Sequence, residues 1–174
     1  MPEAAVRLRV VAVFMLGCAS ASVAASGRAI AAPRAGVGPL CRAGDLAGAI
    51  IDIQGAAGSQ FGRLILVNTS SRTCHTKGFI GGRFIGADGR PMATHVTRDH
   101  STPARTVVVK PGAAAALELR WSVVSSGGRS CARARWLRVT PPDDTSTLRV
   151  YFGHLLCRGR VEVRALTDPT QVGG

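Results

Sequence analysis

Lysine, aromatic residues and acids are all scarce in this sequence. Only two lysines, Lys77 and Lys110, occur among 22 basic residues, aromatic residues make up 5 %, and 10 acidic residues leave a formal net charge of +12. No aromatic ladder accompanies the arginines, which argues against a single-stranded nucleic acid as the partner. The arginine excess indicates either a solvated cationic surface or a patch that binds anions.

The common catalytic and cofactor motifs are missing as well. The sequence has no G-x-S-x-G elbow, no phosphate-cradling Gly-rich loop and no C-x-x-C pair. An α/β-hydrolase, a nucleotide-binding site, a zinc ribbon and a thioredoxin-type site therefore lack support. The four histidines show no H-x-H or H-x-x-x-H spacing, so we predict no metal site and no cofactor.

Two polar segments carry residue types that enzymes use. Asp99, His100 and Ser101 are neighbours, and neighbours in an extended chain point to opposite faces, so they cannot form a triad with one another. We expect them to lie in an exposed loop. Asp143 and Asp144 follow two prolines and are interpreted as solvated turn acids rather than paired catalytic carboxylates.

The N-terminal segment resembles an export signal. Arg7 and Arg9 precede an apolar stretch that is too short and too rich in small residues to span a membrane. We expect residues 1–31 to form a helical signal peptide, cleaved at the A-x-A site before residue 32 or at the earlier small-x-small site at residues 22–24. The alternatives are lipoprotein-type processing after residue 17, with lipid on Cys18, and an uncleaved cytosolic helix.

The cysteine count agrees with export. Either processing route removes Cys18 from disulfide chemistry, and the four remaining cysteines indicate two disulfides in an oxidising compartment, rather than four buried thiols. Four cysteines allow three pairings. We predict Cys41–Cys74 and Cys131–Cys157, which close the shortest loops, and each should stabilise the fold by about 3–4 kcal/mol in the chain-entropy model.

Apolar and polar residues alternate with a period of two after residue 40, and no segment keeps a helical period over three turns. Asn68 is interpreted as a turn residue rather than a glycosylation site, and the Gly81-Gly82 pair as a β-bulge. This pattern predicts an all-β sandwich over residues 41–168, with a linker at 32–40 and a flexible tail at 169–174. Eight short strands are expected, at residues 46–53, 61–67, 79–85, 106–109, 115–123, 136–139, 148–152 and 161–165.

A set of short motifs in the same region resembles a known family. The motifs are Cys41, residues 55–58, 66–74, 78–79, 88–90, 110–113 and 137–142, and Cys157. In their order and spacing they are similar to the secreted actinobacterial domain of unknown function 4232, although Ile80 stands where such domains often carry proline. The resemblance implies an exported, immunoglobulin-like antiparallel β-sandwich of about seven or eight strands, often behind a leader or lipid anchor. It implies no activity.

Arginines gather near the second pair of cysteines. One group of arginines lies around Cys131, and the other follows Cys157. If these cysteines are joined, the two groups are expected on nearby strands, where they would form a cationic face. Trp121, Trp136 and Phe61 are expected in the core. The candidate anion-binding residues are Arg133, Arg135, Arg138, Arg158, Arg160 and Arg164, and Arg129 lies beside them.

The sequence therefore favours a secreted or lipid-anchored envelope domain that binds or scaffolds and is not an enzyme. An arginine-rich module that binds an anionic cell-wall polymer or a lipid surface is the alternative, and another envelope protein is a further possible partner. A small secreted hydrolase or metal-binding protein is a remote alternative. Nucleic acid is not an expected partner, and no transmembrane span is expected after processing.

Overall fold

The computed structural model describes residues 37–125 and 131–171. The predicted signal peptide, the lipidation candidate Cys18, the first part of the linker, Arg129 and the end of the predicted tail lie outside the described residues. Within them, no helix is long and apolar enough to cross a membrane.

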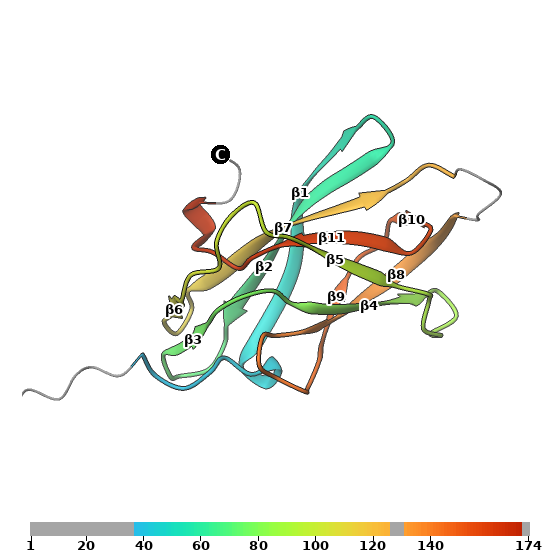
Figure 1. Cartoon of the computed structure of the whole chain (residues 1–174). Helices are drawn as coiled ribbons and strands as arrows, with labels where there is room; N and C mark the ends of the chain where they lie inside the picture. Colours follow the sequence, from blue (N-terminus) through green and yellow to red (C-terminus); the bar gives the residue numbers. More distant parts are fainter. Residues whose placement is uncertain (1–36, 126–130, 172–174) are drawn as a thin grey trace, which may run out of the picture. The chain divides into compact units, whose positions relative to one another are not determined.

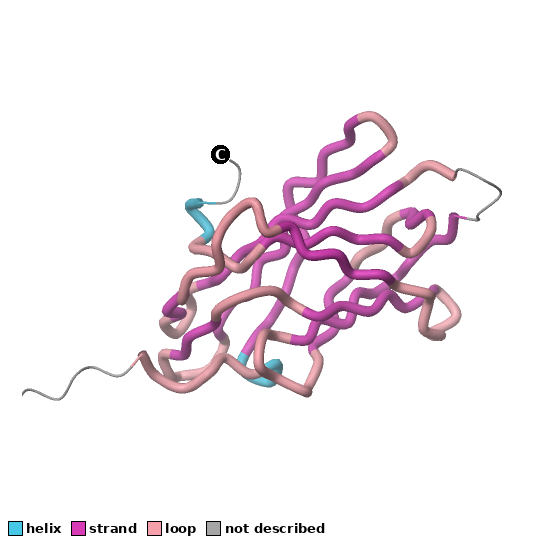
Figure 2. The backbone as a smooth tube through the Cα atoms, viewed as in Figure 1, coloured by secondary structure: helices cyan, strands magenta, loops and turns pink. Residues whose placement is uncertain are grey.

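The described chain is all-β, as predicted, with eleven strands and two short 3₁₀ helices (Figures 1 and 2). The eight expected strands correspond to β1, β2, β4, β6, β7, β8, β9 and β11. The additional strands β3, β5 and β10 have three to five residues, which is too short for a clear alternating pattern. The elements are η1 (Ala43–Asp45), β1 (Leu46–Ala56), β2 (Ser59–Asn68), β3 (Cys74–Thr76), β4 (Gly81–Gly86), β5 (His95–Asp99), β6 (Val107–Val109), β7 (Ala114–Ser122), β8 (Cys131–Thr140), β9 (Leu148–Tyr151), β10 (Leu155–Cys157), β11 (Arg160–Arg164) and η2 (Pro169–Gln171).

The strands form two larger sheets and one small one. The first sheet has the order β1-β2-β7-β11-β5, the second has the order β10-β8-β4 with β9 also paired to β8, and β3 pairs with β6. The expectation of an antiparallel fold is wrong at one place, because β5 runs parallel to β11. The loop predicted around Asp99 is also partly wrong, since Asp99 ends strand β5. This edge strand is half exposed and therefore lacks the apolar alternation that would reveal it.

One hydrophobic core lies between the two larger sheets. Leu119 and Trp121 of β7 belong to the same buried cluster as Phe84 of β4 and Leu137 of β8. The ring of Phe152 joins the layers, with its centroid 4.7 Å from that of Phe84 and 5.0 Å from that of Trp121. Trp121 is in the core as predicted.

Two aromatic residues that the sequence assigned to the core lie elsewhere. Trp136 and Phe61 are only half buried, and each has an arginine guanidinium over its ring. An aromatic side chain that contacts a guanidinium group in this way can remain at the surface. The presence of apolar residues around it in the sequence therefore does not by itself show whether it points into the core or toward solvent.

The disulfides join Cys41 to Cys74 and Cys131 to Cys157, the two pairs with the shortest loops. The first pair holds the start of the domain, where Cys41 N–H also donates to the His75 carbonyl at 2.9 Å. Two disulfides in a small domain suggest an oxidising, extracytoplasmic location. At the other end, residues 169–171 form η2 rather than a flexible tail.

The turn after β2 depends on Asn68, which is fully buried. Its amide nitrogen donates to the carbonyls of Arg72 (2.7 Å) and Val109 (3.0 Å), and its side-chain oxygen accepts from the Ser70 N–H (3.0 Å). Asn68 is the last residue of β2 rather than a turn residue, but its side chain uses both amide hydrogens to hold the turn that follows, which supports a structural role over a glycan acceptor. The Gly81-Gly82 bulge prediction is wrong, because both glycines pair regularly with Thr140 and Val139.

The prediction of two solvated turn acids is right for Asp143 and wrong for Asp144. Asp143 is exposed, whereas the Asp144 side chain is only 5 % exposed. Asp144 accepts hydrogen bonds from the N–H groups of Ala43 (2.7 Å), Thr145 (2.8 Å) and Ser146 (3.1 Å). Burial acts to raise the pKa of Asp144, but these hydrogen bonds outweigh it and hold the pKa well below its usual range. Asp144 therefore ties the turn before β9 to η1.

Candidate anion-binding surface

Three arginines stand side by side across the second sheet. Arg138 of β8 is the direct partner of Arg83 in β4 on one side and of Arg149 in β9 on the other. All three are exposed. Because adjacent strands lie roughly 4.8 Å apart and directly paired residues share a face, the three side chains rise together from the outer face. We call Arg83, Arg138 and Arg149 the arginine row.

The core determines this register. In β8, Leu137 and Val139 are buried and turn Arg138 outward. In β9, Leu148 and Val150 are buried and turn Arg149 outward. A slip of one residue in either strand would bury an arginine and expose the core, so the row is a consequence of how the apolar residues pack.

A β-bulge places an aromatic side chain beside the row. Ile85 and Gly86 of β4 are consecutive, but their partners in β8 are Trp136 and Ala134, so Arg135 is the extra residue. The guanidinium of Arg149 lies 4.6 Å from the Trp136 ring centroid and that of Arg135 lies 5.8 Å from it. Cation–π contacts of this kind hold the guanidinium groups near the outer face. Tyr151 packs edge-on against Trp136 from β9, with ring centroids 5.6 Å apart.

The arginine row has no acidic partner among residues 37–125 and 131–171. The ion pairs of the described chain all involve other basic residues. Arg138 instead donates to the hydroxyl of Thr147 at 3.2 Å. Like charges directly opposite each other in a sheet are destabilising, and a bound anion would relieve this repulsion.

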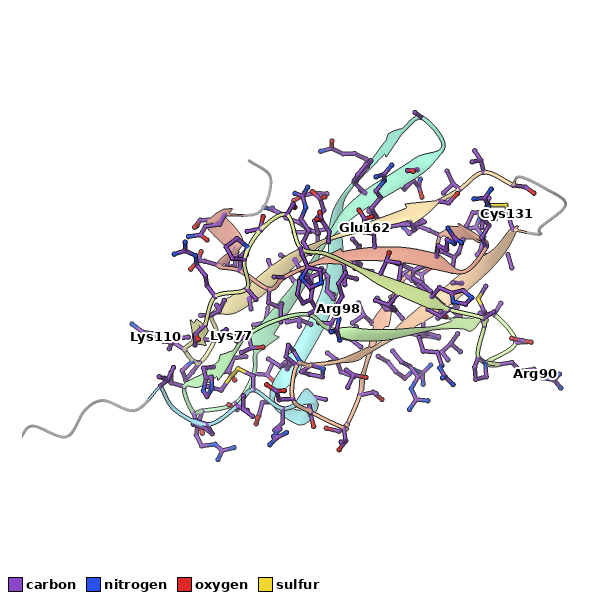
Figure 3. The ribbon with its side chains drawn as sticks, viewed as in Figure 1. Lys77, Arg90, Arg98, Lys110, Cys131 and Glu162 are labelled. Atoms are coloured by element: carbon purple, nitrogen blue, oxygen red, sulfur yellow. A yellow bond between two sulfur atoms is a disulfide. The ribbon has the colours of Figure 1, made fainter. Side chains whose placement is uncertain are left out.

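The surface at the row is hollowed on both sides of Arg138. The larger hollow, of about 720 Å³, lies between the β4–β5 turn at residues 86–89 and the side chains of Arg135, Trp136 and Arg149. The smaller hollow, of about 320 Å³, is lined by Gly82, Arg83 and Thr140. Both hollows include Arg138 and Thr147, so they adjoin at these two residues, and we call the two hollows together the trough. Figure 3 shows Arg90 at the tip of the same turn.

The arginines that the sequence selected do not all meet here. Arg135 and Arg138 line the trough, and Arg133 lies on the same strand but donates to the Gly153 carbonyl at 2.6 Å. Arg158 lies in the turn after β10, and Arg160 begins β11. Arg158 follows Cys157, which pairs with Cys131 at the start of β8, whereas Arg160 and Arg164 belong to β11 in the other large sheet.

Arg164 is engaged elsewhere. Its Nε lies 3.0 Å from an Asp99 carboxylate oxygen, and its Nη1 lies 3.6 Å from Glu118. The hydrogen bond to Asp99 raises the pKa of Arg164. The pKa of Asp99 is lowered to about 2, first by the Ser101 N–H and then by the Ser101 side chain and Arg164.

This pairing also shows what the Asp99-His100-Ser101 segment does. Asp99 accepts from the Ser101 N–H at 2.8 Å and from Arg164, which makes it a turn and ion-pair residue. The His100 ring packs on Phe79, with centroids 4.7 Å apart. No group of three His, Cys, Asp or Glu residues in the described chain is arranged to hold a metal ion.

The sequence interpretation missed Arg83, Arg149 and Trp136. Each arginine lies between apolar residues in its strand, which marks it as outward-facing. β9 follows β8 closely in the sequence, but β4 lies far from both, so no local pattern records that Arg83 joins the row. Trp136 lies two residues before Arg138 and alternates with the buried Leu137 and Val139, so the local pattern already places it on the outer face.

The fold is that of a small, disulfide-linked all-β domain, and its two disulfides suggest an extracytoplasmic location. Residues 41–167 match the model of the domain of unknown function DUF4232, and the chain belongs to this family. No curated protein matches the chain.

Proposed function

We propose that this protein is an exported, non-enzymatic binding domain that holds an anionic ligand on the outer face of β4, β8 and β9. The observation that carries the proposal is the arginine row, which concentrates three cationic groups without a carboxylate partner in the described chain. Arginine presents five N–H donors in a fixed planar fork, so a cluster of arginines suits oxyanions better than a cluster of lysines.

The proposal includes a location and a fold type. Export followed by release, or by anchoring through Cys18, is supported by the leader-like segment and by the two disulfides. An immunoglobulin-like sandwich is supported by the single core between two sheets of short strands and by the resemblance of the motifs to the family.

The absence of catalysis is part of the proposal. It is supported by the structural roles of two acids that could otherwise act in catalysis. Asp99 forms an ion pair with Arg164, and Asp144 accepts a hydrogen bond that holds a turn against η1. Among the described residues that line the trough, Asp88 is the only carboxylate, and it accepts a hydrogen bond from the Arg90 N–H within its own turn.

The test is the salt concentration at which the processed domain elutes from an immobilised sulfated polysaccharide such as heparin. The site variant carries Arg83→Gln, Arg138→Gln and Arg149→Gln. The control variant carries Lys77→Gln, Arg105→Gln and Lys110→Gln, which are exposed residues outside the trough. Figure 3 shows Lys77 and Lys110 at the end of the domain opposite to Arg90.

Both variants lose three positive charges. We expect the site variant to elute at clearly lower salt than the control variant, because only it removes a clustered set of charges. If both elute at the same salt concentration, net charge alone governs retention and the proposal is wrong. Thermal unfolding of each variant verifies that the fold is intact.

A further inference from the structure

The arginine row runs across the strands rather than along one of them. Arg83, Arg138 and Arg149 come from three adjacent strands, so their backbone positions are separated by the strand spacing of roughly 4.8 Å. The trough continues on both sides of Arg138, toward Arg83 in one direction and toward Trp136 in the other. A ligand that meets each guanidinium group above its own strand would therefore be extended and carry several anionic groups.

We propose that the ligand is a linear polymer with closely spaced phosphate groups, which lies in the trough across β4, β8 and β9. This inference rests on the proposed anion-binding function and assigns the ligand class. Each phosphate has two or more free oxygens, so it can accept from two neighbouring guanidinium groups at once and reduce the repulsion between them.

The side chains around the row favour phosphate over isolated carboxylates. The hydroxyls of Thr140 and Thr147 line the trough beside Arg138 and can donate to oxygens that the guanidinium groups leave free. Arg149 lies over the Trp136 ring, so part of its conformational freedom is already lost before a ligand arrives. A densely charged chain gains most from such a prearranged set of donors.

The shape of the surface favours a polymer strand over a membrane. The β4–β5 turn forms a wall of the trough, and the carboxylate of Asp88 lies in this wall. A flat anionic bilayer would meet this wall before it reached the arginine row, whereas a narrow strand can follow the row beside the wall. The aromatic ring of Trp136 is occupied by Arg149 and Arg135 and is not offered for insertion among lipids.

The experiment is calorimetric titration of the processed domain at constant ionic strength and constant total phosphate. The probes are orthophosphate, tripolyphosphate and a long inorganic polyphosphate, with polygalacturonate as the carboxylate polymer and phosphatidylglycerol vesicles as the membrane. We expect affinity per chain to rise at least about tenfold from tripolyphosphate to the long chain, as linked groups engage successive arginines. We expect polygalacturonate and vesicles to bind at least about tenfold more weakly than the long polyphosphate.

Two variants test the geometry. The site variant defined above should lose about tenfold or more in affinity for long polyphosphate, and the matched control variant about twofold or less. Trp136→Leu keeps the net charge and releases Arg149 and Arg135, so it should weaken binding by about three- to fivefold. A purely electrostatic surface would not respond to this uncharged change.

The outcomes separate the inference from the proposed function. Equal affinity for orthophosphate and the long chain indicates a single-anion site and overturns the inference. Equal or tighter binding of polygalacturonate or of vesicles overturns it as well. In each of these cases, the proposed function still holds if the site variant elutes from heparin at lower salt than the control variant. If the two variants elute at the same salt concentration, the proposed function itself is refuted.

Discussion

Asp144 provides the sharpest test of how the fold is held together. The Asp144 side chain is 5 % exposed, and its two carboxylate oxygens accept from different N–H groups: Oδ2 accepts from Ala43 N–H, and Oδ1 accepts from the N–H groups of Thr145 and Ser146. In Asp144→Asn, one of the two oxygens becomes an NH₂ group. If the amide oxygen stays with Thr145 and Ser146, the NH₂ group faces the Ala43 N–H, and that donor loses its acceptor.

The cost combines the unpartnered Ala43 N–H with the loss of the ion pair between Asp144 and the half-exposed Arg42, whose nearest atoms are 3.5 Å apart. A buried donor left without a partner costs about 1–3 kcal/mol, and hydrogen bonds to charged groups lie in the upper part of the usual range. We expect Asp144→Asn to lower the free energy of unfolding by about 2 kcal/mol, which for a domain of this size is a fall in Tm of roughly 6–10 °C. Asp143→Asn changes an exposed neighbour with φ of 56°, a conformation that Asn tolerates, and should stay within about 0.5 kcal/mol.

The same variants predict a pH dependence. The pKa of Asp144 is lower in the folded state than in the unfolded state, where it is about 3.9. Its contribution to stability is therefore fully present above the unfolded pKa and is lost as the pH falls through the folded pKa. The stability difference between the native protein and Asp144→Asn should narrow between about pH 5 and about pH 2.

Urea unfolding with intact disulfides measures these differences, with an unchanged m-value as the sign that only stability has changed. The reasoning is refuted if Asp144→Asn and Asp143→Asn have the same midpoint. It is also refuted if the difference between the native protein and Asp144→Asn does not change when the pH is lowered.

Three further predictions concern the stability of the fold. Asn68→Ala removes a fully buried amide that makes hydrogen bonds to three other residues. We expect urea unfolding to show that the free energy of unfolding falls by about 3 kcal/mol, and a fall below about 1 kcal/mol would contradict the structural role of Asn68. Gly159→Ala should lower the free energy of unfolding by more than about 2 kcal/mol, and Gly89→Ala by about 1 kcal/mol. Both glycines have positive φ, but of the two only Gly159 would place a Cβ against a backbone carbonyl; equal Tm values for the two variants would disprove this. Replacing Cys131 and Cys157 with serine opens a loop of 26 residues and should lower the free energy of unfolding by about 3.5 kcal/mol. An unchanged denaturation midpoint would show that this disulfide does not constrain the unfolded chain.

The strands with strong alternation could be predicted from the sequence, and the weak ones could not. In β7, Leu117, Leu119 and Trp121 are buried at every second position, and a local pattern reveals such a strand. Strand β5 is half exposed and is a strand because β11 lies beside it. Its parallel pairing depends on chain segments about sixty residues apart, which a local pattern does not contain.

The candidate site was only half predictable for the same reason. Arg135 and Arg138 could be selected because they crowd one segment of sequence, but Arg83 and Arg149 join them through strand register. Arg164 looked equally available in the sequence, yet two acids from other strands neutralise it. The clustering of arginines in the sequence thus identified the part of the surface that belongs to β8. Strand pairing added the arginines of β4 and β9, and ion pairs removed Arg164 from the site.

The most direct test of the central claim is a heteronuclear NMR titration that follows the arginine Nε–Hε signals while long inorganic polyphosphate is added. If the polymer lies along the arginine row, the signals of Arg83, Arg138 and Arg149 shift together and saturate, with a smaller response at Arg135, while those of Arg105 and Arg160 do not shift. Shifts spread evenly over the exposed arginines, or centred on arginines outside the trough, would contradict the account.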